Sequence, residues 1–239
     1  MIWVRSALFN ASFFVATALM GTIALPLILL SRIWVMRLAR AWSWVIVGLL
    51  RVIVGVRIEV TGRENLPAGP LVVASKHQSA FDTVIWFALL SDPAYVLKQE
   101  LLRIPVFGWH ARAMGMIPVD RTGGGAALRA MLRRCAAALA EGRQVVIFPE
   151  GTRSAPGTRP AYQPGIVAIA GLGTAPLVPV ATDSGRIWPR RGFLKHPGVI
   201  RISILPPLAA GTGRAALLPA LEAAIETESA RLLTLDACG

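Results

Sequence analysis

The chain has 239 residues, enough for one substantial domain and a short additional segment. Hydrophobic residues make up 54% and charged residues only 16%, against about 25% charged in a typical soluble domain, so part of the chain is predicted not to face water. The net charge of +12 is almost entirely arginine and favours anionic partners such as acidic lipids or phosphorylated substrates, although a compositional preference for arginine would give the same charge. There is no zinc-finger spacing or RNA-stacking signature, which argues against a nucleic-acid partner.

Residues 7–30 form an apolar segment without a charged side chain. A helix rises about 1.5 Å per residue and about 20 residues span the hydrocarbon core of a bilayer, so this segment is long enough to cross. Pro26 is expected to kink the helix or to shorten its regular part. A cleaved signal peptide is the less favoured alternative, because the run exceeds the usual roughly 7–15 apolar residues and lacks a small-x-small cleavage site.

A second apolar stretch, 42–56, follows a segment in which three arginines are interleaved with apolar and aromatic residues. Such a mixture is typical of the headgroup zone of a membrane. The stretch is short for a crossing and is interrupted by Arg51, which is costly in lipid, so we predict a helix that lies on the membrane or dips into it. The three arginines are Arg32, Arg37 and Arg40.

Residues 1–56 are therefore predicted to form an N-terminal membrane anchor, a membrane-associated helical hairpin, and residues 57–239 a separate domain. Arginines are enriched on the cytoplasmic side of membrane helices, so their position after the first helix places the rest of the chain in the cytosol, at the inner membrane. The alternative is that both apolar helices are core helices of a soluble fold.

After Arg57, glycine and proline recur at short intervals and the apolar runs become short. Alternating strands and helices indicate an α/β fold, and short all-apolar strands suit a sheet that is covered on both faces. The predicted strands are 58–60, 71–74, 94–97, 116–119, 144–148, 177–180 and 199–204. The predicted helices are 81–90, 126–140, with Gly142 as a C-cap signal, and 215–233.

The cysteines Cys135 and Cys238 are too far apart in the sequence to indicate a disulfide framework or a metal site. Their number and spacing favour a reducing compartment.

Three polar clusters follow predicted strands, where open α/β sheets place their sites. In the first, His77 stands at the end of a strand and Asp82 follows five residues later. The two can meet only if His77 precedes the helix and Asp82 lies in its first turn. In that arrangement Asp82 would orient the imidazole, and His77 would act as a general base. A loop histidine beside a helix-capping aspartate is the alternative.

The second cluster is Gly115 to Arg121 and the third is Phe148 to Ser154. Each contains an arginine that follows an apolar strand. Arg121 closes the second cluster and is suited to clamp a phosphate through two hydrogen bonds. In the third, Glu150 could shape the turn and bond to backbone or acceptor groups, Gly151 permits close backbone approach, and Arg153 is a second candidate phosphate contact. An ordinary solvated strand end and a generic βα loop are the respective alternatives.

Taken together, these clusters resemble the glycerolipid acyltransferase superfamily, in its 1-acyl-sn-glycerol-3-phosphate acyltransferase (PlsC) branch. That family carries four sequence blocks in a fixed order, and this chain has all four between Ile58 and Pro207. The resemblance implies a mixed, mostly parallel sheet flanked by helices. The blocks here are His77 to Asp82, Gly115 to Arg121, Phe148 to Ser154, and Val178-Pro179-Val180.

The resemblance implies that His77 is the catalytic base, with Asp82 as its partner. It also implies that five residues handle a phosphate-bearing acceptor, namely Arg121, Glu150, Gly151, Thr152 and Arg153. Two positions depart from the family pattern. Lys76 stands where relatives often have asparagine, and Gln163-Pro164 stands where many have a lysine pair.

The expected function is transfer of an acyl group from acyl-CoA or acyl carrier protein to the sn-2 hydroxyl of lysophosphatidic acid, which forms phosphatidic acid. No metal and no cofactor besides this acyl co-substrate is expected. The expected partners are membrane lipids, lysophosphatidic acid and the acyl donor, with no nucleic acid. Two alternatives stay open: the same transfer to another lysolipid such as a lyso-ornithine lipid, and a non-catalytic membrane protein that binds anionic lipid.

Overall fold

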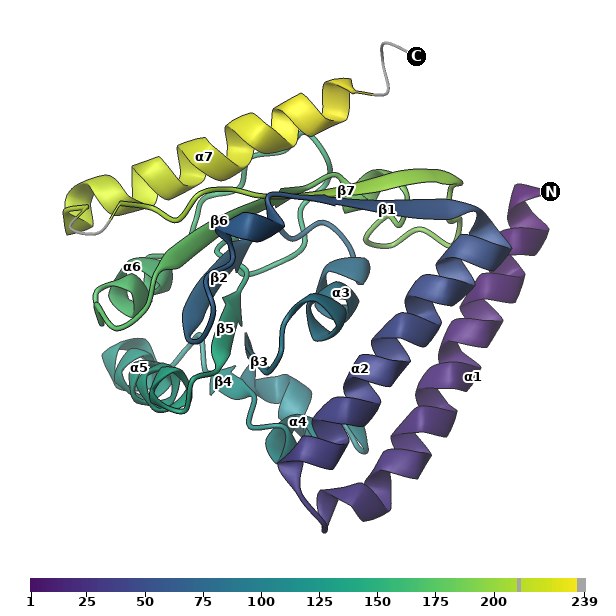
Figure 1. Cartoon of the computed structure of the whole chain (residues 1–239), viewed down its shortest axis with the longest axis horizontal. Coiled ribbons are helices and arrows are strands. Elements are labelled where there is room, and N and C mark those ends of the chain that lie inside the picture. The colour runs from purple at the N-terminus through teal and green to yellow at the C-terminus, as the bar shows by residue number, and fades with distance from the viewer. Residues whose placement is uncertain (210–211, 236–239) are drawn as a thin grey trace.

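In the computed structural model, which describes residues 1–209 and 212–235, the chain forms a seven-stranded sheet with helices on both faces (Figure 1). The strand order is β1-β7-β6-β2-β5-β3-β4, and every neighbouring pair is parallel except β6 and β7. The predicted α/β class and the mostly parallel sheet are thus confirmed. The strands are β1 (Val56–Thr61), β2 (Leu71–Ser75), β3 (Pro93–Lys98), β4 (Ile117–Val119), β5 (Gln144–Ile147), β6 (Leu177–Thr182) and β7 (Gly198–Ile204).

The three helices predicted after residue 57 are present, the last of them as a 21-residue helix, α7. Two short helices, α4 and α6, were not predicted, because seven and six residues are too few to show a helical period. The α-helices in the described ranges are α1 (Ile2–Ile28), α2 (Arg32–Leu49), α3 (Phe81–Leu89), α4 (Phe107–Ala113), α5 (Gly124–Ala140), α6 (Gly165–Ala170) and α7 (Arg214–Thr234).

The sheet separates two apolar clusters, and β2 contributes to both because successive side chains in a strand point to opposite faces. Leu71 and Val73 belong to the cluster covered by α1, α2, α3 and α4, whereas Val72 belongs to the cluster covered by α5, α6 and α7. Cys135 of α5 lies in the second cluster, where burial raises the pKa of its thiol to about 12. Cys238 lies outside the described residues.

The two N-terminal helices lie side by side along one edge of the molecule (Figure 1). The second begins at Arg32, after a connection of only three residues, and continues through a π-helical turn, Leu50–Val54. The prediction that this helix starts near Trp42, behind an arginine-rich headgroup segment, was therefore wrong. Short connections are usual between antiparallel helices, and arginine is a good helix former, so the arginine-rich segment continues the helix.

Two of these arginines bind the rest of the protein. Arg32 pairs with Asp92, with a shortest N–O distance of 2.6 Å. Arg40 donates to the carbonyl oxygens of Leu90 and Ser91, at 2.9 and 2.6 Å. The hairpin is thus fastened to the segment that leads into β3.

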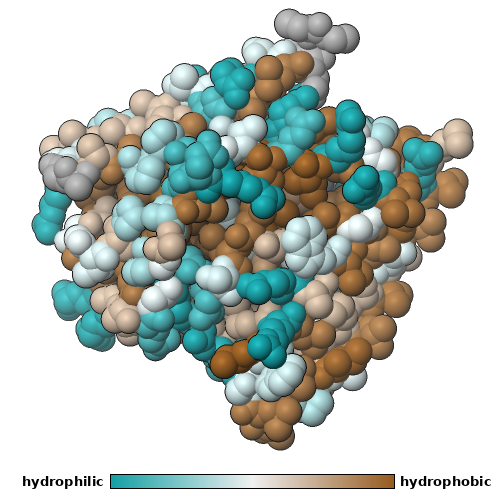
Figure 2. Space-filling view, viewed as in Figure 1, coloured by the Kyte–Doolittle hydropathy of each residue, from teal (hydrophilic) through white to brown (hydrophobic). Residues whose placement is uncertain are grey.

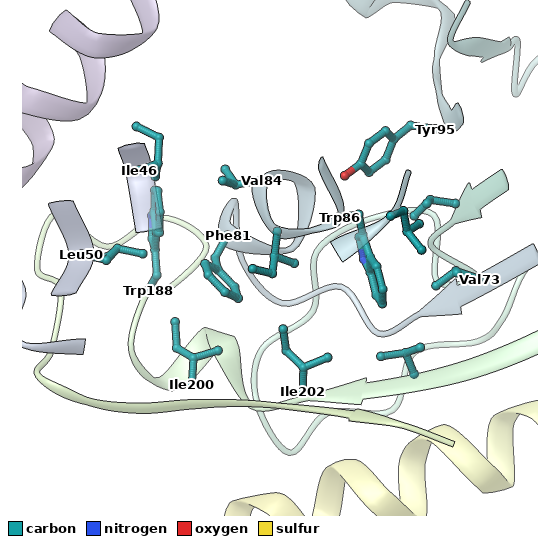
Figure 3. Packing of buried hydrophobic residues seen from close by; sticks show 14 of the residues in the cluster. Ile46, Leu50, Val73, Phe81, Val84, Trp86, Tyr95, Trp188, Ile200 and Ile202 are labelled. Atoms are coloured by element: carbon teal, nitrogen blue, oxygen red, sulfur yellow. The ribbon is translucent and has the colours of Figure 1, made fainter. Parts of the chain in front are cut away.

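The inner face of the hairpin belongs to the same core as the sheet. Figure 3 shows Ile46 and Leu50 beside Trp188, with Ile200 of β7 on the sheet side. From α1, Phe9 packs edge-on against Trp188, with ring centroids 5.2 Å apart. The hairpin and the sheet share one core. The division of the chain into an anchor, 1–56, and a separate domain, 57–239, therefore stays a prediction.

The outer face of the hairpin is exposed and apolar. It carries Phe14 and Leu19 of α1, and hydrophobic residues gather on this side of the space-filling view, at lower right (Figure 2). The 27-residue α1 and the 23-residue helical segment Arg32–Val54 are long and apolar enough to cross a membrane by length and composition. These features support association with a membrane.

Candidate active site

His77 lies in the loop that joins β2 to α3. The strand ends at Ser75 and the helix begins at Phe81, so Asp82 falls in the first helical turn, as the pairing requires. The imidazole Nδ1 of His77 lies 3.1 Å from Oδ2 of Asp82. The imidazole is 12% exposed, whereas the carboxylate is buried. The structure thus brings the two residues together at a point that solvent reaches.

The carboxylate of Asp82 is held by several donors. Its Oδ2 also accepts the backbone N–H groups of Gln78 and Ser79, at 2.7 and 2.8 Å. Its Oδ1 accepts the hydroxyl of Ser184, from the loop after β6, at 2.6 Å. These hydrogen bonds fix the direction of the carboxylate. Ser184 was not predicted, because the sequence places it 102 residues away.

The imidazole ring is fixed from its face as well. Phe148, at the end of β5, stacks on His77 with the centroids 4.0 Å apart and the planes 19° from parallel. The backbone of His77 is also held on both sides, since its N–H donates to Oε1 of Glu150 at 2.9 Å and its carbonyl oxygen accepts from the N–H of Ser154 at 2.8 Å. The Phe148–Ser154 loop thus supports the histidine loop.

Glu150 lies behind this loop rather than on an open face, because it is only 3% exposed. Burial raises the pKa of the Glu150 carboxyl, and the ammonium of Lys76 opposes that shift. Glu150 was expected to bond either to backbone or to the acceptor, and the structure shows the bond to the backbone of His77. A contact between Glu150 and the acceptor stays a prediction, and the burial of Glu150 argues against such a contact.

Arg121 reaches the same loop from the end of β4. Gly151 has a φ of +70°, a region that favours glycine. A Cβ atom built there would lie 3.7 Å from the guanidinium carbon of Arg121 and 3.3 Å from Cγ of Gln163. Gly151 therefore permits a close approach between the loop and the exposed Arg121, beside Gln163.

Arg190 is a further cation at this loop, and sequence patterns did not single it out. Its guanidinium donates to the carbonyl oxygen of Arg153 at 2.8 Å and to the hydroxyl of Thr152 at 3.2 Å. Thr152 is exposed and Arg153 half-buried. Arg121, Arg153 and Arg190 thus lie around one loop, whose Ser154 is bonded to His77, and this arrangement suits an anionic group beside the imidazole.

The fourth sequence block, Val178-Pro179-Val180, forms the centre of β6 and is fully buried. Its Val180 carbonyl oxygen accepts the N–H of Lys76 at 2.8 Å, so the block positions the loop that carries His77. Within the described ranges, no group of three or more His, Cys, Asp or Glu side chains is placed to hold a metal ion.

Several known proteins are similar to this chain. The family model described as Acyltransferase matches residues 57–183. A 1-acyl-sn-glycerol-3-phosphate acyltransferase of Pseudomonas aeruginosa is 37% identical over 177 residues, which are 74% of this chain and 69% of that protein. The 1-acyl-sn-glycerol-3-phosphate acyltransferase alpha of Mus musculus is 30% identical over 159 residues, which are 65% of this chain and 56% of the mouse protein.

The fold has a solved counterpart. The crystal structure of the 1-acyl-sn-glycerophosphate (LPA) acyltransferase PlsC from Thermotoga maritima superposes with a TM-score of 0.78, and the match covers 97% of this chain and 98% of that chain at 24% identity. A match over nearly the whole of both chains includes the N-terminal helices, so they are part of the shared fold. The match to the family model and the similarity to the Pseudomonas aeruginosa enzyme show that the chain belongs to the acyltransferase family.

Proposed function

We propose that this protein is a 1-acyl-sn-glycerol-3-phosphate acyltransferase, which moves an acyl group from acyl-CoA or acyl carrier protein to the sn-2 hydroxyl of lysophosphatidic acid. The observation that carries the proposal is the pairing of His77 with the buried Asp82 beside a loop surrounded by arginines. Relatives from a bacterium and a mammal carry the corresponding name.

The acceptor is bound through its phosphate. Arg121 and Arg153, with Arg190 beside them, receive the anionic headgroup through charge-assisted hydrogen bonds. Because the Phe148–Ser154 loop, around which these arginines lie, is bonded to the backbone of His77 through Ser154, the bound headgroup lies near the imidazole and its free hydroxyl is directed toward Nε2. Thr152 contributes a hydroxyl to the same surface, and Gly151 keeps the backbone accessible.

The chemical step is general base catalysis. Asp82 faces Nδ1, so Nδ1 carries the proton and Nε2 is the basic nitrogen. His77 removes the proton of the acceptor hydroxyl while the oxygen attacks the thioester carbon. The C–S bond then breaks, the imidazolium returns the proton to the departing sulfur, and the products are the ester and the free thiol. Asp82 stabilises the transient imidazolium.

The membrane supplies the acceptor and accommodates the acyl chains. The apolar outer face of α1 and α2 anchors the protein in the inner membrane, and the arginines that follow α1 favour a catalytic domain on the cytosolic side.

A second candidate acceptor is a lyso-ornithine lipid. It is favoured by one observation, namely that Gln163 lies beside Gly151, where many relatives have a lysine. The loss of that positive charge weakens the preference for a phosphate. The third alternative, a non-catalytic protein that binds anionic lipid, does not explain why three hydrogen bonds from other residues hold the carboxylate of Asp82 against the imidazole of His77.

The test is thiol release from oleoyl-CoA by the purified protein in nanodiscs, with separate additions of lysophosphatidic acid, lyso-ornithine lipid and lysophosphatidylcholine. We expect the highest kcat/KM with lysophosphatidic acid. A preference for the lyso-ornithine lipid would establish the second candidate. Absence of lysolipid-dependent thiol release from both oleoyl-CoA and oleoyl-acyl carrier protein would refute the enzymatic proposal.

A further inference from the structure

Lys76, the residue before the catalytic histidine, is a buried cation that acyl transfer as described above does not use. Its side chain is 1% exposed. The ammonium lies 2.6 Å from Oε1 of Glu226, 3.1 Å from the carbonyl oxygen of Thr158 and 3.6 Å from Oε1 of Glu150. A buried charge is costly unless it is paired and hydrogen-bonded, so these partners are what keeps the lysine in place.

The main partner comes from the other end of the chain. Glu226 stands 150 residues after Lys76, on α7, and is itself 5% exposed. Its Oε1 also accepts the hydroxyl of Tyr162 at 2.8 Å. Burial, reinforced by the charge of Glu226, raises the pKa of Tyr162, so its hydroxyl stays protonated and remains a donor.

The helix that carries Glu226 is firmly placed. Leu221 and Ile225 of α7 are fully buried in the second apolar cluster, and Figure 1 shows α7 lying along the sheet near β6. A carboxylate on such a helix is a rigid point of attachment. Lys76 is therefore held between the sheet, through its N–H bond to Val180, and α7, through its ammonium.

The same network reaches the backbone of the catalytic residue. Oε1 of Glu150, which lies 3.6 Å from the ammonium of Lys76, is also the atom that accepts the N–H of His77. The contacts run from Glu226 through Lys76 to Glu150 and His77. A catalytic base must hold its place to within about 0.5 Å, and a misplacement of about 1 Å can reduce the rate about 100-fold.

We propose that Lys76, Tyr162 and Glu226 are positioning residues that hold the backbone of His77 for acyl transfer, and that the C-terminal helix thereby takes part in building the active site. The inference rests on the proposed function, because a positioning role matters for catalysis only if His77 is the base in acyl transfer. A purely structural ion pair would instead affect only the free energy of unfolding.

The test uses a variant in which apolar side chains of similar size replace the three proposed positioning residues, Lys76→Met/Tyr162→Phe/Glu226→Leu. Glu150 is kept, and because burial already raises the pKa of its carboxyl, it can take up a proton when the ammonium of Lys76 is removed. Such replacements of buried ion pairs are often neutral for stability. We expect a melting temperature near that of the wild type, a kcat at least about tenfold lower, and KM values for donor and acceptor within about twofold. The matched control is Arg231→Gln, which removes an exposed ion pair from the same helix and should leave kcat unchanged.

Two single substitutions refine the test and replace it if the triple variant does not fold. Glu226→Gln keeps an oxygen that can accept from Lys76 and Tyr162, so it should retain at least about half of the wild-type kcat, whereas Glu226→Leu should lose about tenfold. Equal activity of these two variants, or a triple variant with the wild-type kcat, would overturn the proposal.

A readout without turnover separates this proposal from the proposed function. The chain has three histidines, so the ring resonances of His77 can be assigned by their loss in His77→Ala. The triple variant should shift and broaden these resonances, and Arg231→Gln should not. If the wild type acylates no lysolipid, the proposed function fails while the spectra still decide the positioning role. Unchanged His77 resonances in the triple variant would contradict it.

Discussion

At the scale of single residues, the imidazole of His77 is held from three directions. Asp82 lies against Nδ1, Phe148 against the ring face, and the backbone is bonded on both sides by Glu150 and Ser154. A side chain held in this way is preorganised, so little reorganisation is needed when a substrate binds. The same arrangement makes the contribution of the imidazole testable without loss of the fold.

His77→Ala should lower kcat by about 10²–10⁴-fold, because positioned base catalysis typically supplies that factor. The melting temperature should fall by no more than a few degrees, since the loop backbone keeps its hydrogen bonds. Thiol release and thermal unfolding would be measured side by side. His196→Ala, which removes an exposed histidine, is the control. Near-normal turnover of His77→Ala would remove His77 from the mechanism.

Arg121→Ala should raise the KM for lysophosphatidic acid about tenfold, because a charge-assisted contact to the phosphate is lost. The kcat at saturating acceptor should stay within about threefold of the wild type, since Arg121 does not contact the imidazole. Initial rates at varied acceptor and fixed oleoyl-CoA would show this difference, with Arg231→Gln as the control. An unchanged KM would exclude Arg121 as a phosphate ligand.

The sequence was informative about residues close to one another in the chain and uninformative about distant ones. His77 and Asp82 are five positions apart, so their contact could be predicted from the position at which helix α3 begins. Ser184 contacts Asp82 from 102 residues away, and Glu226 contacts Lys76 from 150 residues away. Pairings over such separations depend on the strand order, which the pattern of apolar residues does not specify.

At the scale of elements, the hairpin of α1 and α2 has two different faces. The inner face packs on the sheet core, and the outer face exposes large apolar side chains, among them Phe14 at 68% and Leu19 at 59%. Apolar residues on both sides explain why α1 shows a continuous apolar run rather than an amphipathic period. The start of α2 was the least predictable boundary, because its first half contains three arginines and such a segment is also typical of the headgroup zone of a membrane.

Phe14→Glu/Leu19→Glu should reduce the fraction of protein that floats with phosphatidylglycerol-containing liposomes by at least about half, because charged side chains on this face oppose insertion. The control is Leu128→Glu, which places the same charge on an exposed leucine of α5. Flotation equal to that of the wild type would show that the outer face of α1 does not contact lipid.

At the scale of the whole molecule, the topology brings separate sequence blocks to one edge of the sheet. β2, β5 and β6 are parallel neighbours, and β3 connects β5 to β4 in the same direction. Their carboxyl ends carry His77, the Phe148–Ser154 loop, Ser184 and Arg121. Short apolar runs that alternate with helical segments predicted the α/β class and the strands, but no local feature of the sequence indicated the antiparallel pairing of β6 with β7.

The shared core of hairpin and sheet limits how this protein can be shortened. A truncation that begins at Val56 would remove Phe9, Ile46 and Leu50, all fully buried, and would expose to water the indole of Trp188 and the side chains of β7 beneath them. Removing the two N-terminal helices would therefore create a new apolar surface on the catalytic part. The helices that carry the exposed apolar face also complete the core beside the sheet.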